Sequence, residues 1–178
     1  FGTRAGRCAA DFAKKSTAVS IDEAQLETAA SSALAPFDRG PDGENPYQIQ
    51  YDLQDSMQEL VGIVRAADEM QRALEVIDRL RSRASRATVA GHRQYNNGWH
   101  TAMDLASLLV VSEAVTRAAL LRTESRGAQF REDFPAKDAE WGKCNIIVKA
   151  GPDGQMQVEK RALPPIPDEL KAVIEEMK

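Results

Sequence analysis

Three long stretches of helical periodicity constrain this chain more than any other feature of its sequence. They cover residues 47–65, 67–90 and 99–123, and their apolar side chains recur at steps of three and four residues. That spacing places the side chains along one face of an α-helix. The apolar positions are Leu53, Met57, Leu60, Val61 and Val64 in the first stretch, Met70, Leu74, Ile77, Leu80, Ala84 and Ala87 in the second, and Met103, Leu105, Leu108, Leu109, Val111, Val115, Ala118, Ala119 and Leu121 in the third.

Helices of this length with short connections pack most simply side by side and antiparallel. We therefore predict a mainly α fold, built on an antiparallel three-helix bundle that is spectrin-repeat-like. The third helix is apolar on most of its sides. We expect it to lie against both other helices or against a further domain.

Shorter helices are predicted ahead of the bundle. Residues 1–15 are rich in alanine and end in a lysine pair, which suits the C-terminus of a helix. Ser20 followed by Glu23 matches a capping box, which predicts a second helix to about Leu34. The glycine, proline, aspartate and asparagine residues of the segment 38–46 then predict a linker.

The chain changes character after the bundle. Apolar and polar residues alternate in 144–150 and 155–161, on either side of the turn sequence 151–154, which predicts a β-hairpin. Prolines at 164, 165 and 167 then precede a short predicted helix over 168–177. We predict three parts: a helical lead-in and linker helix (1–45), the bundle (46–127), and a charged loop with the hairpin and the C-terminal helix (128–178).

Composition excludes several classes of function. The 178 residues carry 27 acidic against 23 basic side chains, a net charge of −4 that favours neither nucleic acid nor a membrane surface as a partner. Cys8 and Cys144 lie far apart without further ligands at metal-binding spacing, so we expect reduced thiols and no metal site. No run approaches the ~20 apolar residues of a membrane span. Because the chain also begins at Phe1, we expect a soluble fragment.

Sequence patterns of catalysis are absent from the chain. It contains no glycine-rich nucleotide loop, no nucleophile elbow, no zinc-protease motif and no Glu-x-x-His pair for a di-iron bundle. His92 and His100 flank a predicted turn, where a surface or capping role is favoured over proton transfer. We interpret the arginines at 79, 81, 83 and 86 as solvated or interface-facing, and the aromatic residues as sealing the edge of the core; these are Tyr47, Tyr51, Tyr95, Trp99 and Trp141.

One dense group of charges directly follows the third predicted helix. Its members are Arg122, Glu124, Arg126, Arg131, Glu132 and Asp133. Arginine forks and carboxylates placed around the flexible Ser125-Arg126-Gly127 turn can form bidentate ion pairs. We favour a structural network that ties the helix end to its surroundings. Direct contact with a cofactor, a substrate or a partner subunit is the alternative.

These residues carry a resemblance to a known family. The string Glu124-Ser125-Arg126-Gly127-Ala128, followed by Arg131, Asp133 and Pro135, resembles the motif that closes the helical domain of succinate dehydrogenase and fumarate reductase flavoprotein subunits. Residues 53–65, Asp138 with Trp141, and residues 1–6 resemble further segments of that family. The chain departs from the family pattern at Gln129, usually histidine, and at Gly142 and Cys144, usually leucine and histidine.

The resemblance implies a parent enzyme that interconverts succinate and fumarate through FAD. It also implies electron transfer to an iron–sulfur subunit, and a location on the cytoplasmic face of a membrane, reached only through the complex. The family's flavin-binding and catalytic residues precede Phe1. We therefore predict no catalytic, cofactor-binding or metal residue in this chain, and no FAD bound to it. The predicted interface or structural motif is Arg122, Glu124, Ser125, Arg126, Gly127, Arg131 and Asp133.

Two alternatives stay open at this point. A stand-alone helical interaction module would recruit partners through the arginines of 79–86 and the proline-rich tail. The C-terminal domain of an L-aspartate oxidase would share the bundle and the string at 124–127, without an iron–sulfur partner. The predicted partners under the favoured hypothesis are the upstream flavin and capping domains and the iron–sulfur subunit.

Overall fold

The computed structural model describes residues 1–17 and 19–177 and divides them into two compact units, Phe1–Ala35 and Pro36–Lys178. Ala18 and Lys178, which fall inside the predicted ranges 1–45 and 128–178, lie outside the described residues. The first unit contains helix α1 (Gly2–Lys15) and most of helix α2 (Glu23–Asp38). Both helices were expected, but α2 begins later and ends later than predicted. Its first turn is capped by Asp22, whose Oδ1 accepts from the N–H groups of Ala24 and Gln25, and not by Ser20.

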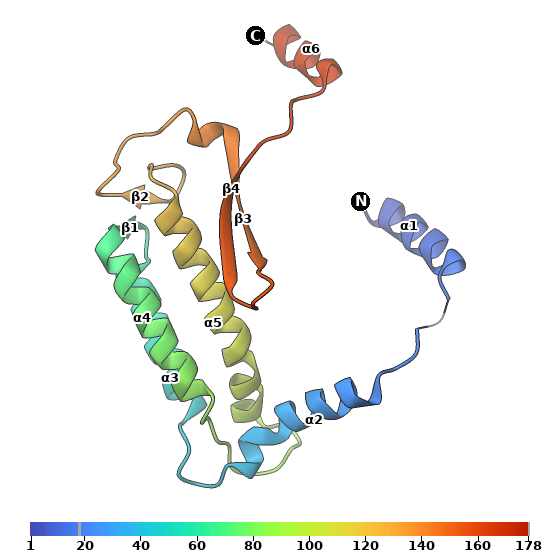
Figure 1. Cartoon of the computed structure of the whole chain (residues 1–178), viewed down its shortest axis with the longest axis vertical. Coiled ribbons are helices and arrows are strands. Elements are labelled where there is room, and N and C mark those ends of the chain that lie inside the picture. The colour runs from blue at the N-terminus through green and yellow to red at the C-terminus, as the bar shows by residue number, and fades with distance from the viewer. Residues whose placement is uncertain (18, 178) are drawn as a thin grey trace. The chain divides into compact units, whose positions relative to one another are not determined.

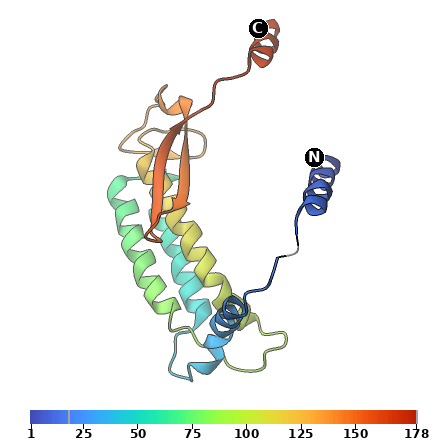
Figure 2. The same ribbon diagram turned by 45° about the vertical axis from the view of Figure 1, so that its right-hand side comes forward.

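The second unit is the predicted three-helix bundle. It consists of α3 (Pro46–Leu60), α4 (Ala67–Ala84) and α5 (Asn97–Leu121), which lie side by side in both views (Figures 1 and 2). The three helices bury one common core. Its members are Ile49, Leu53, Ile77, Leu80, Ala87, Leu105 and Leu109. The prediction of a mainly α fold with an antiparallel bundle is confirmed.

The first and third bundle helices start at side-chain caps. Asn45 precedes Pro46 and accepts a hydrogen bond from the Tyr47 N–H at 2.9 Å. Asn96 accepts from the Trp99 N–H at 3.0 Å in the same way, so α5 starts at Asn97 and not at residue 99. These asparagines satisfy backbone donors that a helix leaves unpaired at its start.

The predicted second helix was too long, because residues 86–88 are drawn into extended pairing with the linker. The backbone N–H of Glu44 donates to the Arg86 carbonyl, and the backbone carbonyl of Glu44 accepts from the Thr88 N–H, both at 2.9 Å. Helix α4 therefore ends at Ala84. Gly43 permits this close approach. A Cβ at Gly43 would lie 2.6 Å from the Thr88 side chain.

The first bundle helix is also shorter than predicted, because the segment after it pairs with the loop beyond α5. Strand β1 (Val64–Arg65) lies parallel to strand β2 (Phe130–Arg131). The Phe130 N–H donates to the Ile63 carbonyl and the Glu132 N–H to the Arg65 carbonyl, each at 3.0 Å. This short pairing joins residues 66 positions apart at one end of the bundle (Figure 1).

The predicted hairpin is present and lies along α5. Strands β3 (Cys144–Ala150) and β4 (Met156–Ala162) are antiparallel, with Cys144 opposite Ala162 and Ala150 opposite Met156. A short 3-10 helix, η1 (Trp141–Lys143), leads into β3. The turn contains Gly154 at φ 76°, a left-handed conformation that glycine adopts without strain. The chain then passes through its prolines into helix α6 (Asp168–Glu176), as predicted.

The prediction that all the aromatic residues seal the core was partly wrong. Trp141 is buried, and the Trp99 ring lies 5.5 Å from the Phe37 ring. Tyr47, Tyr51 and Tyr95 are exposed, at 38%, 57% and 99%. Tyr95 sits in the turn before α5 at φ 55°, within residues 91–95, which are all exposed.

Candidate functional site

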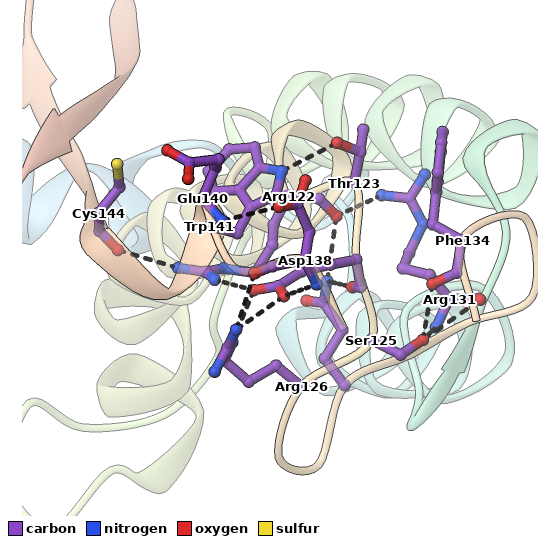
Figure 3. Close-up of polar contacts among 12 residues, drawn as sticks. Arg122, Thr123, Ser125, Arg126, Arg131, Phe134, Asp138, Glu140, Trp141 and Cys144 are labelled. Carbon is purple, nitrogen blue, oxygen red and sulfur yellow. Dashed lines mark hydrogen bonds and ion pairs between the residues drawn. The ribbon is translucent and has the colours of Figure 1, made fainter. Parts of the chain in front are cut away.

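The charged residues after α5 gather in one loop, residues 122–138, which we name the clamp loop (Figure 3). The loop leaves the end of α5, forms β2 and leads to η1 at the base of the hairpin. Seven residues were predicted above to form an interface or structural motif. In the structure, six of them are joined by hydrogen bonds, and the seventh, Gly127, lies in the turn between them.

Arg131 occupies the centre of one half of the clamp loop and is only 1% exposed. Its Nη1 donates to the carbonyls of Ala119, Leu120 and Arg122 at 2.9, 3.1 and 2.9 Å. Ala119 and Leu120 belong to the last turn of α5 and Arg122 directly follows it, where backbone acceptors lack partners and the helix dipole favours a cation. Arg131 therefore caps the C-terminal end of α5 with a side chain that comes from the following loop.

Asp133 completes this half of the loop. Its two oxygens accept from Arg131 Nε and Nη2 at 2.8 and 2.7 Å, a bidentate pair. The same carboxylate accepts from the Ala67 N–H at the first turn of α4, at 3.3 Å. The Arg131 guanidinium also lies 5.1 Å from the centre of the Phe134 ring. Arg131 and Asp133 thus join the end of α5 to the start of α4.

Glu124 occupies the centre of the other half, with its side chain fully buried. Its Oε1 accepts from Arg122 Nη1 at 2.5 Å and from Arg126 Nε at 2.7 Å. Its Oε2 accepts from Arg126 Nη2 at 3.0 Å and from the Asp138 N–H at 2.8 Å. A buried carboxylate requires such partners, and Glu124 has four donors.

The partners of Glu124 fix its charge. The pKa of Glu124 is lowered to about 2, chiefly by the hydrogen bonds from the Arg126 side chain. Burial acts in the opposite direction, and the hydrogen bonds from the Asp138 N–H and from Arg122 lower the pKa further. The same carboxylate raises the pKa of Arg126. Glu124 is therefore ionised at neutral pH and holds no proton to exchange.

Ser125 and Gly127 shape the backbone between the two halves. The Ser125 hydroxyl accepts from the Arg131 N–H at 2.8 Å and donates to the Phe134 carbonyl at 2.9 Å. Arg126 and Gln129 exchange two backbone hydrogen bonds across a tight turn that contains Gly127 at φ 63°. Glycine adopts that conformation without the clash that a Cβ would cause.

Gln129, at the position that is usually histidine in the resembled family, takes part in a fixed bridge. Its Nε2 donates to the carbonyls of Arg122 and Glu124, both at 3.3 Å, and its Oε1 accepts from Arg65 Nη1 at 3.0 Å. Burial, followed by the nearby charge of Arg131, lowers the pKa of Arg65. An amide serves as donor and acceptor at once without titrating. Sequence reasoning missed this role of Arg65, although the residue lies in the segment 53–65 that carried the resemblance.

Trp141 connects the clamp loop to the hairpin. Its Nε1 donates to Thr123 Oγ1 at 3.0 Å, while Arg122 lies 5.0 Å and the Lys160 ammonium 3.9 Å from the ring centre. Cations over an indole ring are attracted to its face. Lys160 comes from β4, and no sequence pattern indicated its contact with Trp141.

The other candidate residues lie outside this network. His92 and His100 are exposed. Three of the four arginines on α4 and just after it form surface ion pairs: Arg81 with Asp78 and Glu113, Arg83 with Glu44 and Asp52, and Arg86 with Glu44. Arg79 is exposed. No group of three or more potential metal ligands occurs within residues 1–17 and 19–177. No helix in that part of the chain is long and apolar enough to cross a membrane.

The fold and the clamp loop define a mainly α-helical domain whose third bundle helix is tied to its neighbours by a charged loop. The family model described as "Fumarate reductase flavoprotein C-term" matches residues 50–172. The chain belongs to this family, and its matched region corresponds to the C-terminal domain of succinate dehydrogenase and fumarate reductase flavoprotein subunits.

Individual relatives agree with the family match. The fumarate reductase flavoprotein subunit of Mycobacterium tuberculosis is 34% identical over 89% of this chain, which spans 28% of that protein. The succinate dehydrogenase flavoprotein subunit of Coxiella burnetii is 33% identical over 69% of this chain and 21% of its own length. The solved structure of Mycobacterium smegmatis Sdh1 in complex with UQ1 matches 98% of this chain and 30% of its own chain, with 38% identity and a TM-score of 0.89.

The L-aspartate oxidase alternative has weaker support. An L-aspartate oxidase of Streptomyces coelicolor is 28% identical over 68% of this chain. The family match also favours the flavoprotein domain over a stand-alone interaction module. The chain spans less than a third of the length of each relative described above.

Proposed function

We propose that this chain is the structural C-terminal domain of an FAD-containing subunit that interconverts succinate and fumarate. In this proposal the domain braces the flavin-binding and capping domains of the same subunit, which passes electrons to an iron–sulfur subunit. The complex lies on the cytoplasmic face of a membrane. The membership of the chain in the flavoprotein family supports this context.

The observation that supports a structural role is that the buried charged groups of the clamp loop already have hydrogen-bond partners within this chain. The Glu124 carboxylate is held by four donors, and Arg131 by the last turn of α5 and by Asp133. Within the described part of the chain, no buried side-chain nitrogen or oxygen lacks a partner. Groups that are satisfied by one another offer little to a substrate, so the loop acts as a rigid connection between α4, α5 and the hairpin.

The residues of this loop do not fit a flavin site. A pyrophosphate group is usually held by free backbone N–H groups of a glycine-rich turn at a helix start. The clamp loop instead follows a helix end, and its arginines are engaged by Glu124, Asp133 and the carbonyls of α5. We therefore propose that the upstream part of the subunit holds the FAD.

Flavin content and substrate choice test this proposal. The gene is tagged at its 3′ end in the source organism, and its complete product is purified. We expect upstream coding sequence, stoichiometric FAD, and reduction of a dye by succinate but not by L-aspartate. The 178-residue chain, expressed alone as the matched control, should carry no flavin. Stoichiometric flavin on that chain, or a complete product without flavin, would refute the proposal, and a response to L-aspartate would favour the oxidase.

A further inference from the structure

The last described segment of the chain carries an apolar face that lies open to solvent. None of the residues of α6 is buried. We define the tail face as six apolar side chains that are between 45% and 83% exposed: Leu163, Ile166, Leu170, Val173, Ile174 and Met177. The last four have the helical spacing that places them on one side of α6, so they form a single stripe.

A helix as short as α6 needs a partner. It has nine residues, whereas isolated helices shorter than ~12–15 residues are only marginally stable in water. Most helical stability in proteins comes from the packing of an apolar face. The stripe on α6 therefore implies a surface that covers it.

The charges of α6 restrict what that surface is. The helix contains Asp168, Glu169, Glu175 and Glu176 against the single base Lys171, a net charge of −3. An acidic helix is repelled by anionic lipid surfaces and by nucleic acid. It is attracted to an apolar groove with lysine or arginine at its rim.

The comparisons show that α6 is part of the matched domain and that much of the matched protein lies outside this chain. The family match extends to residue 172, which is inside α6. The Sdh1 structure matches all but about four of the 178 residues, so α6 has at least a partial counterpart there. The tail is thus part of the region that this chain shares with the Sdh1 structure, while this chain accounts for only 30% of the matched protein. Most of the matched protein therefore lies outside this chain and is available to cover α6.

We propose that the tail face docks into a basic-rimmed apolar groove on the flavin-binding part of the same subunit, an inference that rests on the function proposed above. The tail then holds the C-terminal domain to the flavin-binding part, whereas the clamp loop connects elements within the C-terminal domain. Hydrophobic burial supplies the contact, and the acidic side of α6 sets its orientation.

Amide hydrogen exchange of residues 168–177 tests this inference. It is measured in the complete FAD-loaded subunit, free of its iron–sulfur partner, and in the 178-residue chain. We expect protection in the complete subunit and rapid exchange in the shorter chain. Val173→Glu, on the stripe, should speed exchange in the complete subunit at least about tenfold, because burial of one valine contributes more than a factor of ten. Ala172→Glu adds the same charge on the opposite side and should leave the protection unchanged.

The possible outcomes separate the two proposals. A complete subunit with full flavin and succinate activity but an unprotected tail overturns the docking inference alone. So does protection that appears only on adding the iron–sulfur subunit, only when two copies associate, or already in the 178-residue chain. A gene product that has neither flavin nor upstream sequence refutes both proposals, because the groove would then be absent.

Discussion

Replacement of Arg131 by methionine should cost the domain a large part of its stability. Methionine retains much of the buried aliphatic volume but removes the charge, the bonds to three carbonyls at the end of α5 and the pair with Asp133. Loss of one partner of a buried ion pair typically costs ~3–5 kcal/mol. The Asp133 side chain is 31% exposed and can be rehydrated, so we expect about 3 kcal/mol.

This loss is measurable by thermal and urea unfolding of the chain. In a domain of this size, 1 kcal/mol corresponds to ~2–4 °C, so the Tm should fall by about 6–12 °C. Glu132→Ala removes the exposed charge next to it and should change stability by no more than about 0.5 kcal/mol. Arg131→Lys, which keeps the charge but not the fork, should fall between the two.

A double-mutant cycle with Asp133→Asn isolates the pair from the helix-end bonds. We expect a coupling energy of about 1–2 kcal/mol, with the remainder of the Arg131 effect persisting in the Asp133→Asn background. If Arg131→Met unfolded at the same temperature as Glu132→Ala, the buried arginine would contribute nothing net. The reasoning that Arg131 terminates α5 and joins it to α4 would then be wrong.

Two further predictions concern the other half of the clamp loop. Because the pKa of folded Glu124 is about 2, below its ordinary value of 4.5, its contribution to stability is complete above pH 4.5 and is lost as the pH falls toward 2. Urea unfolding at a series of pH values should show this slope, and Glu124→Gln should reduce it; an unchanged slope would contradict the assignment. In the complete subunit, Arg126→Ala should loosen the loop and lower the Tm and the flavin content together, whereas normal assembly and flavin with lost turnover would indicate a catalytic role.

The agreement between sequence and structure is best where the physics is local. Helical periodicity located α3, α4 and α5, and the alternation around Gly151–Gly154 located the hairpin, because each pattern depends only on neighbours along the chain. The errors in the secondary structure lie at the ends of helices. Helices were predicted over 47–65 and 67–90, but the observed helices α3 and α4 end before residues 65 and 90. The residues beyond each helix end pair with segments that are far away in the sequence.

The charged composition of the loop after α5 was evident in the sequence, and so was its likeness to a flavoprotein motif. The sequence could not say which arginine pairs with which carboxylate. Arg122, Arg126 and Arg131 are similar in type and spacing, yet two of them hold Glu124 and the third holds Asp133 and the end of α5.

The sequence by itself determined the helices, the hairpin, the family and the presence of a charged loop, since short-range periodicity and residue type carry that information. Only the tertiary structure decided that β1 pairs with β2, that Gln129 bridges to Arg65, and that Lys160 lies over Trp141. Each of these contacts joins residues that lie from 19 to more than 60 positions apart. Their geometry depends on how the helices pack, which no local pattern records.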